Sequence, residues 1–244
     1  MGPKGKRRQR ARKRLDVSLV VSVLESEYGS PRFVRRFEPM EELVSCILSQ
    51  HTADANSFPA FTRLRETFQD WQAVVDAGWE RVAEVVRKAG LANQKAKSIV
   101  GALEAIHRSF GDYSLDQLGK MSMEEAKAKL IGLPGVGPKT AAIVLCFGFG
   151  MPAIPVDTHV HRVSLRLGLI PPNTSADKAH DLLLESVPSD LAFRFHVALI
   201  QHGRLTCRAP FPNCPACVLA QMCPSAKDFD RPATKKGRPQ TRKA

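Results

Sequence analysis

The chain has 244 residues, of which 43% are hydrophobic, and a formal net charge of +12. This length suffices for one large hydrophobic core or two modest ones. No apolar run approaches eighteen residues, which argues against a membrane-spanning helix. The apolar stretch 17–24 follows a basic start, but it is short, runs into acidic residues and lacks a small-residue cleavage site, unlike an export signal. We therefore expect an intracellular protein.

The positive charge is concentrated at the two ends of the chain. Residues 1–14 contain eight Lys or Arg and no acidic residue, and residues 227–244 contain seven Lys or Arg and two Asp. The 21 basic and 22 acidic residues between them nearly cancel. Both tails are predicted to be disordered, because like charges repel and little apolar surface is present. They either add salt-sensitive affinity for nucleic-acid phosphates or only raise solubility, while the body must bind through a local patch.

The remaining sequence predicts helices throughout. Asp16 is expected to cap a helix over Val17–Tyr28 that ends at Gly29. Ser122 and Glu125 have the spacing of a capping box at the start of another helix. No hairpin turn flanked by alternating residues is present, so the predicted fold is all-α. In chain order, the other helices are expected over 40–50, 58–68, 71–77, 79–88, 93–110, 122–130, 141–147, 175–187 and 190–202.

A glycine-rich turn joins two of these helices at residues 132–138. Gly135 and Gly137 permit positive φ and a close approach of backbone to a ligand. Pro138 suits the first position of the next helix, where its missing N–H is not needed. Free amides at a helix start, together with the positive end of the helix dipole, can bind an anion such as a DNA or RNA phosphate. An ordinary tight turn between two core helices would carry the same residues.

An amine and a carboxylate follow this turn. Lys139 stands at the start of the second helix, where burial and the helix dipole would favour a neutral, nucleophilic amine able to attack C1′ of a damaged nucleotide. It is also compatible with simple phosphate contact. Asp157 follows the apolar run 154–156 and can stabilise positive charge on a sugar ring. Asp157 can equally cap a helix that begins near Thr158, and the two roles are compatible.

Four of the six cysteines lie within seventeen residues, in the spacing C-x6-C-x2-C-x5-C. Prolines interrupt regular structure between them, so a bound metal centre would supply order to this segment. Disulfides are disfavoured because nothing indicates export. The chemistry of four thiolates suits zinc as well as an iron–sulfur cluster. Cys46 and Cys146 lie in apolar helical runs and are expected to pack as small hydrophobic residues.

Several stretches together resemble the endonuclease III branch of the DNA glycosylases. The run 130–166 resembles that family's helix-hairpin-helix, its glycine/proline-rich loop and its aspartate. The stretches 48–54 and 90–96 resemble the family's two DNA-inserting loops, and 202–207 resembles the approach to its iron–sulfur cluster. The cysteine spacing also matches the [4Fe–4S] loop of this family. The resemblance extends over residues 15–226.

This resemblance implies a domain organisation. It predicts two helical lobes, a DNA-binding cleft between them and a C-terminal [4Fe–4S] loop. One lobe is expected to contain residues 15–34 and 155–226, with the cluster loop at 203–226. The other is expected to contain residues 35–154, with the helix-hairpin-helix at 122–147.

The resemblance also assigns roles. Lys139 corresponds to the Schiff-base lysine and Asp157 to the essential aspartate of a bifunctional enzyme, which removes an oxidised or damaged pyrimidine and then nicks the strand by β-elimination. The relatives that are specific for adenine mismatches lack this lysine. The resemblance therefore argues against an adenine mismatch as the substrate of this chain. The expected partner is double-stranded DNA containing damaged bases or abasic sites, bound by a monomer. The expected cofactor is a [4Fe–4S] cluster held by Cys207, Cys214, Cys217 and Cys223.

A second set of residues is expected to contact DNA. Leu91 follows a glycine at a loop tip and is a candidate wedge for the gap left by a flipped base, unless it packs into a core. Gln50 or His51 would fill the opposite side, and the sequence does not decide between them because it differs here from the best-known members. The complete predicted set is Gln50, His51, Leu91, Gly135, Val136, Gly137, His159 and Arg204.

Three other interpretations fit parts of the sequence. A monofunctional or mismatch-directed glycosylase of the same fold would use Asp157 without needing Lys139 as nucleophile. A DNA-binding module without catalysis would use only the hairpin and the tails. A zinc-stabilised scaffold would use the four clustered cysteines.

Overall fold

The computed structural model describes residues 15–229, and within this range it contains helices and no strand. The predicted all-α fold is therefore confirmed. No helix in the described part combines the length and the apolar character needed to span a bilayer. The predicted disordered tails fall outside the described residues, except that 227–229 belong to the last helix.

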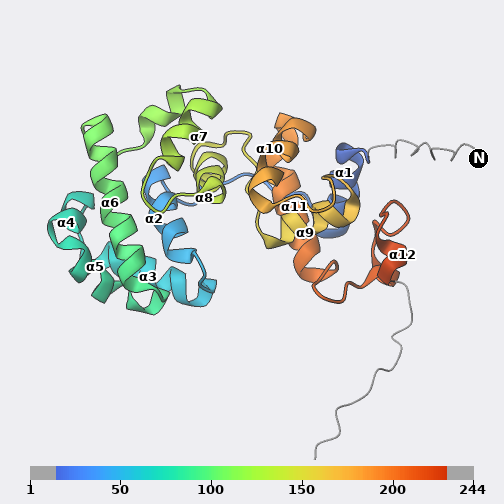
Figure 1. Cartoon of the computed structure of the whole chain (residues 1–244), viewed down its shortest axis with the longest axis horizontal. Coiled ribbons are helices and arrows are strands. Elements are labelled where there is room, and N and C mark those ends of the chain that lie inside the picture. The colour runs from blue at the N-terminus through green and yellow to red at the C-terminus, as the bar shows by residue number, and fades with distance from the viewer. Residues whose placement is uncertain (1–14, 230–244) are drawn as a thin grey trace, which may run out of the picture.

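The helices divide between a left and a right half of the molecule, as Figure 1 shows. Most predicted helices occur within a few residues of their expected bounds. The α-helices are α1 (Val17–Tyr28), α2 (Pro39–Ser49), α3 (Asp54–Thr67), α4 (Trp71–Asp76), α5 (Gly78–Val85), α6 (Ala92–Phe110), α7 (Met123–Ile131), α8 (Pro138–Ile143), α9 (Thr158–Leu167), α10 (Ala176–Ser186), α11 (Ala192–Leu205) and α12 (Ala226–Phe229). Short 3-10 turns are η1 (Arg87–Ala89), η2 (Asp116–Lys120), η4 (Ser189–Leu191) and η5 (Cys214–Ala216), and η3 (Val144–Gly148) is a π-helix.

Each half has its own hydrophobic core. The first core is formed by buried residues between Met40 and Ala153 and lies in what we call the central lobe. The second joins α1 to buried residues between Ile154 and Leu219, and we call this half the terminal lobe. The chain crosses from one core to the other in the segment 29–38 and again after Ala153. Both crossing segments therefore lie where the two lobes meet.

Local capping explains several helix boundaries. The Oδ1 atom of Asp16 accepts hydrogen bonds from the first turn of α1, and Gly29 ends that helix, as predicted. Ser122 and Glu125 form the predicted capping box at α7. Each such cap satisfies backbone groups that a helix end leaves without an internal partner.

Two boundaries differ from the sequence prediction. Helix α3 begins at Asp54, four residues before the expected start, so Pro59 lies inside the helix. Pro59 is exposed, and the helix accommodates it with the loss of one internal hydrogen bond. The helix expected over 141–147 is instead α8 followed by η3, whose wider turns differ from those of an α-helix. Hydrophobic periodicity cannot distinguish these two turn types in so short an apolar run.

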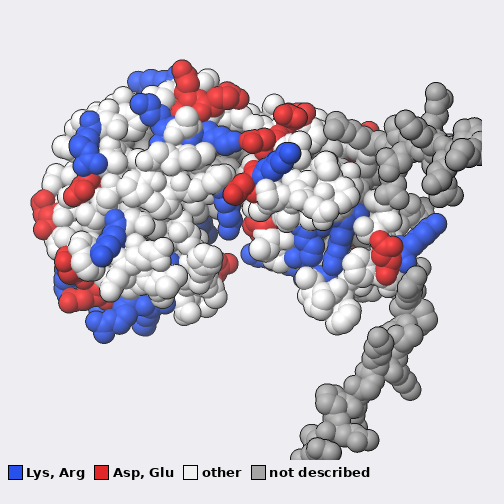
Figure 2. Space-filling model, viewed as in Figure 1, with Lys and Arg blue, Asp and Glu red and all other residues white. Residues whose placement is uncertain are grey.

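Charge on the folded body is local. Figure 2 shows Lys and Arg gathered along the lower edge of the central lobe, over α3 and α5, and at the margin of the hollow between the two lobes. Acidic side chains lie beside these basic groups at both places. A nearly neutral body therefore still offers positive surface beside the hollow, which favours a polyanion at that place.

The two hairpin glycines have different structural roles. Gly135 has φ +75°, and a Cβ built on it would lie 2.6 Å from both Cβ and Oγ of Ser98. Gly137 has φ −99°, and a Cβ there would meet no atom within 4 Å. Only Gly135 thus adopts the positive φ expected for both, and Gly135 lets the hairpin pack directly against α6.

We predict that Gly135→Ala destabilises the fold by about 1–3 kcal/mol, because both the backbone conformation and the contact with Ser98 become strained. The matched variant Gly137→Ala should change the free energy of unfolding by less than about 1 kcal/mol. Urea denaturation of both variants measures the difference. Equal destabilisation of the two would contradict the assigned roles.

Candidate active site

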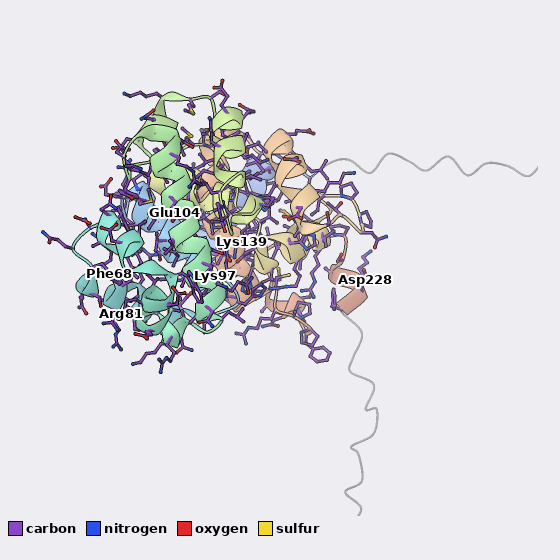
Figure 3. All side chains as sticks on the ribbon, turned by 60° about the vertical axis from the view of Figure 1, so that its left-hand side comes forward. Phe68, Arg81, Lys97, Glu104, Lys139 and Asp228 are labelled. Atoms are coloured by element: carbon purple, nitrogen blue, oxygen red, sulfur yellow. The ribbon has the colours of Figure 1, made fainter. Side chains whose placement is uncertain are left out.

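A cleft of about 580 Å³ lies between the two lobes. Its walls come from one face of α2, from α8 and η3, from α11, from the start of α3 and from both crossing segments. In Figure 3, Lys139 lies near the middle of the molecule, whereas Arg81 and Asp228 lie toward opposite ends. The lining residues are Arg32, Val34, Arg36, Glu42, Ser45, Cys46, Ser49, Asp54, Ser57, Phe58, Lys139, Ile143, Phe147, Asp157, Phe193, His196 and Ile200.

The cleft brings the predicted amine and carboxylate together. Lys139 comes from the first turn of α8 in the central lobe, and Asp157 from the start of α9 in the terminal lobe. Lys139 is exposed, so the burial expected from the sequence is absent in the free protein. Its ammonium is therefore accessible from the cleft, and desolvation requires a ligand that fills this space.

Asp157 is held rigidly by the helix that it caps. Its Oδ1 atom accepts hydrogen bonds from the backbone N–H groups of His159 at 2.9 Å and Val160 at 2.7 Å. Within residues 15–229, Oδ2 makes no hydrogen bond. The predicted cap is confirmed, and one oxygen remains for a bound group in the cleft. The preceding apolar residues Ile154 and Val156 are each 3% exposed, which anchors the carboxylate from behind.

His196 on α11 lies in the same wall and was not identified from the sequence. Its Nδ1 lies 2.8 Å from the carbonyl oxygen of Pro155, and because a carbonyl only accepts, this nitrogen donates. Burial lowers the pKa of His196 to about 4, while the charge of Asp157 acts to raise that pKa and the charge of Lys139 acts to lower it. The charges of Asp157 and Lys139 therefore both act on one neutral imidazole.

The hairpin is attached to the central lobe by Gln50. The Nε2 atom of Gln50 donates to the carbonyl of Gly135 at 2.9 Å and to Oγ1 of Thr140 at 3.3 Å. Gln50 therefore supports the hairpin from inside the lobe. His51, its neighbour, is exposed with φ +53°, and is the more accessible of the two candidates for entry into DNA.

Two exposed loop tips lie beside each other. Leu91 has φ +47° and is 57% exposed, so it does not pack into a core. The loops that carry His51 and Leu91 meet at Lys95, which is only 3% exposed. Its Nζ donates to the carbonyl of Leu48 at 2.6 Å, to Oγ1 of Thr52 at 2.6 Å and to the carbonyl of Ala89 at 2.7 Å. Burial lowers the pKa of Lys95.

The remaining predicted DNA contacts lie outside the lining of the cleft. Arg204 is exposed in the last turn of α11. His159 is half-buried, and its Nδ1 lies 3.1 Å from Nη2 of Arg162. A Cβ on Gly203 would lie 2.8 Å from that of His159, so α9 and α11 approach closely here. Val136 is buried in the central core, which leaves only its backbone for a ligand.

The four clustered cysteines line one cavity in the terminal lobe. Cys207, Cys217 and Cys223 are free thiols. Burial raises the pKa of Cys217 and Cys223, and the negative charges of the neighbouring cysteines raise it further. Mutual effects of this kind require sulfurs that lie near one another. Among residues 15–229, no three Cys, His, Asp or Glu side chains are arranged to hold a metal ion in this conformation.

Two cationic side chains of α9 support the cysteine loop and were not identified from the sequence. Arg162 donates from Nε to the carbonyl of Cys207 at 3.0 Å and from Nη2 to that of Gly203 at 2.8 Å. Arg166 donates from Nη1 to the carbonyl of Arg208 at 2.9 Å and contacts the Cys207 sulfur at 3.3 Å. Helix α9 thus contacts the cleft at its start and the cysteine loop farther along.

The fold and the cleft define a two-lobed helix-hairpin-helix protein with a lysine and an aspartate facing one cavity. The sequence pattern of the HhH-GPD superfamily of base excision DNA repair proteins matches residues 44–189. The chain belongs to this family.

Similar proteins include the endonuclease III enzymes of two bacteria. Endonuclease III of Thermotoga maritima is 35% identical over 193 residues, which are 79% of this chain and 86% of that protein. Endonuclease III of Escherichia coli K12 is 33% identical over 192 residues, with the same coverage. A structure of a non-covalent endonuclease III–DNA complex superposes with a TM-score of 0.72 at 29% identity, covering 87% of this chain and 95% of that one. A trapped endonuclease III–DNA covalent intermediate gives a TM-score of 0.73 at 28% identity, covering 89% and 100%.

We predict a pH-dependent contribution of His196 to stability. Its folded pKa of about 4 lies below the unfolded value near 6.5, so the unfolded chain binds more protons between these values. The contribution is complete above about pH 6.5 and is lost as the pH falls toward 4, amounting to about 2 kcal/mol by pH 5. Urea denaturation at pH 7 and pH 5 should show a smaller loss for His196→Gln than for the unsubstituted protein. Equal losses would contradict this assignment.

Proposed function

We propose that the chain removes damaged pyrimidines from duplex DNA and then cleaves the strand at the resulting abasic site. The observation that carries this proposal is the convergence of Lys139 and Asp157 on one cleft that is flanked by the helix-hairpin-helix. A site for excision must admit a nucleotide that has left the base stack. The cleft volume of about 580 Å³ falls within the range of about 300–1,000 Å³ typical of small-molecule sites.

Binding of the duplex begins at the hairpin and the two loops. Gly137 leaves the backbone at the start of α8 open to a phosphate, because nothing occupies the space next to its Cα. His51 and Leu91 are positioned to enter the gap that the flipped nucleotide leaves. Filling this gap offsets part of the few kcal/mol that unstacking costs.

The chemistry uses the amine and the carboxylate. The neutral Lys139 amine attacks C1′, the bond between C1′ and the base nitrogen breaks, and the base leaves with the electron pair and a proton. Asp157 stabilises the positive charge that develops on the sugar, using the oxygen that does not cap α9. The C1′–O4′ bond then breaks, O4′ takes a proton, and C1′ becomes a protonated Schiff base with Lys139. This Schiff base loses a C2′ proton, and the 3′ phosphate departs by β-elimination. The covalent DNA intermediate of the related endonuclease III supports this route.

We also propose a [4Fe–4S] cluster held by the four cysteines. Their arrangement around one cavity and their thiol chemistry support a metal centre. The match to endonuclease III relatives over most of the chain, together with the cysteine spacing, supports an iron–sulfur cluster over zinc. When bound, the cluster would order the cysteine loop beside Arg204 and Arg208. A DNA substrate further supports the intracellular, DNA-associated location expected from the sequence, with a monomer as the acting unit.

Borohydride trapping tests the role of Lys139. The unsubstituted protein should form a covalent adduct with a duplex that contains an oxidised pyrimidine, and Lys139→Gln should form none because no amine reaches C1′. Lys129→Gln, an exposed lysine on α7, serves as the matched control and should trap normally. Asp157→Asn keeps an oxygen to cap α9, and its base release should fall by about 10²–10⁴-fold. An adduct that persists in Lys139→Gln would refute the scheme.

Metal analysis tests the cluster. Anaerobically purified protein should be brown, absorb visible light and contain iron and sulfide, whereas zinc would give a colourless protein. Cys217→Ser should lose iron and colour, and Cys146→Ala, which removes a buried thiol of the central lobe, should retain both. Stoichiometric zinc without iron would contradict the assignment.

A further inference from the structure

We propose that Glu42 is the residue that recognises the extruded base, by pairing with a ring edge that presents an N–H beside a carbonyl oxygen. This inference rests on the proposed function and deepens it, because it names the chemical feature of the base that the cleft selects. Imide-type pyrimidines, which carry N3–H between two carbonyls, present such an edge.

The position of Glu42 is the first observation. Residues 42, 45, 46 and 49 of α2 line the cleft, and their spacing of three and four places them on one face of the helix. Ser45, Cys46 and Ser49 are small, so Glu42 is the longest polar side chain on this face. It faces the same cavity as Lys139 and Asp157.

The second observation is that the carboxyl group of Glu42 has no partner within the described residues. The residue is only 7% exposed, yet its side chain makes no hydrogen bond or ion pair within residues 15–229. Within the described residues, the fully buried side-chain atoms without a hydrogen-bond partner belong to Arg65 and Ser164, so the carboxyl oxygens of Glu42 reach the open space of the cleft. An unpaired carboxyl group at this wall fits a ligand that arrives in the cleft.

The surroundings of the carboxyl group favour its neutral form. Burial raises the pKa of Glu42, and the charge of Arg36 only partly opposes this effect. Filling of the cleft by a nucleotide removes further water and favours the neutral acid. A neutral carboxyl group offers one donor and one acceptor side by side. Its carbonyl oxygen accepts from N3–H while its hydroxyl donates to the neighbouring carbonyl of the base.

The test separates base recognition from the later chemistry. Glu42→Leu should lower kcat/KM for release of dihydrouracil from duplex DNA by about ten- to a hundredfold, because two hydrogen bonds are lost. Cleavage of a preformed abasic site should change by less than about threefold, because that substrate has no base. Glu42→Gln retains a donor and an acceptor and should restore most of the base release.

A modified substrate strengthens the assignment. Methylation of N3 removes the donor, so it should slow release by the unsubstituted protein and have little further effect on Glu42→Leu. Glu41→Leu is the matched control, because Glu41 lies in the same helical turn but its carboxylate pairs with Arg65 at 3.4 Å instead of lining the cleft.

Four outcomes are decisive. Normal base release by Glu42→Leu, or equal losses in base release and abasic-site cleavage, would overturn the role of Glu42 while leaving the proposed function intact. An N3-methyl effect that is unchanged in Glu42→Leu would overturn it as well. If the unsubstituted protein neither releases bases nor cleaves abasic sites, the proposed function itself fails.

Discussion

The helix cap formed by Asp157 fixes the geometry on which the cleft depends. Two backbone N–H groups hold Oδ1, and the buried residues before Asp157 prevent the carboxylate from shifting along the chain. This point is also where the chain passes from the central core to the terminal core. One short segment thus connects the lobes, begins α9 and supplies a carboxylate to the cleft that Lys139 also lines. The arrangement explains how a residue with an ordinary structural role can also be precisely placed for chemistry.

Helix α9 links this carboxylate to the cysteine loop. Its first turn is capped by Asp157, and farther along Arg162 and Arg166 both donate to the carbonyl of Cys207. Gly203 lets α9 and α11 pack closely between these two points. Disorder in the cysteine loop would therefore remove partners from two cations on the same helix that orients Asp157. The cluster proposed for this loop would in this way support the geometry of the cleft without taking part in the reaction.

Much of this organisation can be predicted from sequence because local rules govern it. The caps at Asp16, Ser122 and Asp157 and the first-turn proline of α8 depend on residues within a few positions of each other. These local rules do not predict features that depend on long-range contacts. The exposure of Lys139, the support of the hairpin by Gln50 and the bonds from α9 to Cys207 depend on residues that the fold brings together. Gly135 and Gly137 look equivalent in sequence, and only the folded structure distinguishes them, through the positive φ of Gly135 and its contact with Ser98.

The buried ammonium of Lys95 limits how far the two neighbouring loops can move apart. It bonds to backbone carbonyls on both sides of the junction between the two loop tips, and the hydroxyl of Thr52 completes its donors. Displacing either loop would strand a cation in apolar surroundings, which is costly. The loop tips at His51 and Leu91 are therefore held rigidly relative to each other in the free protein. With the two tips entering DNA as proposed, such preorganisation would lower the ordering entropy lost on association.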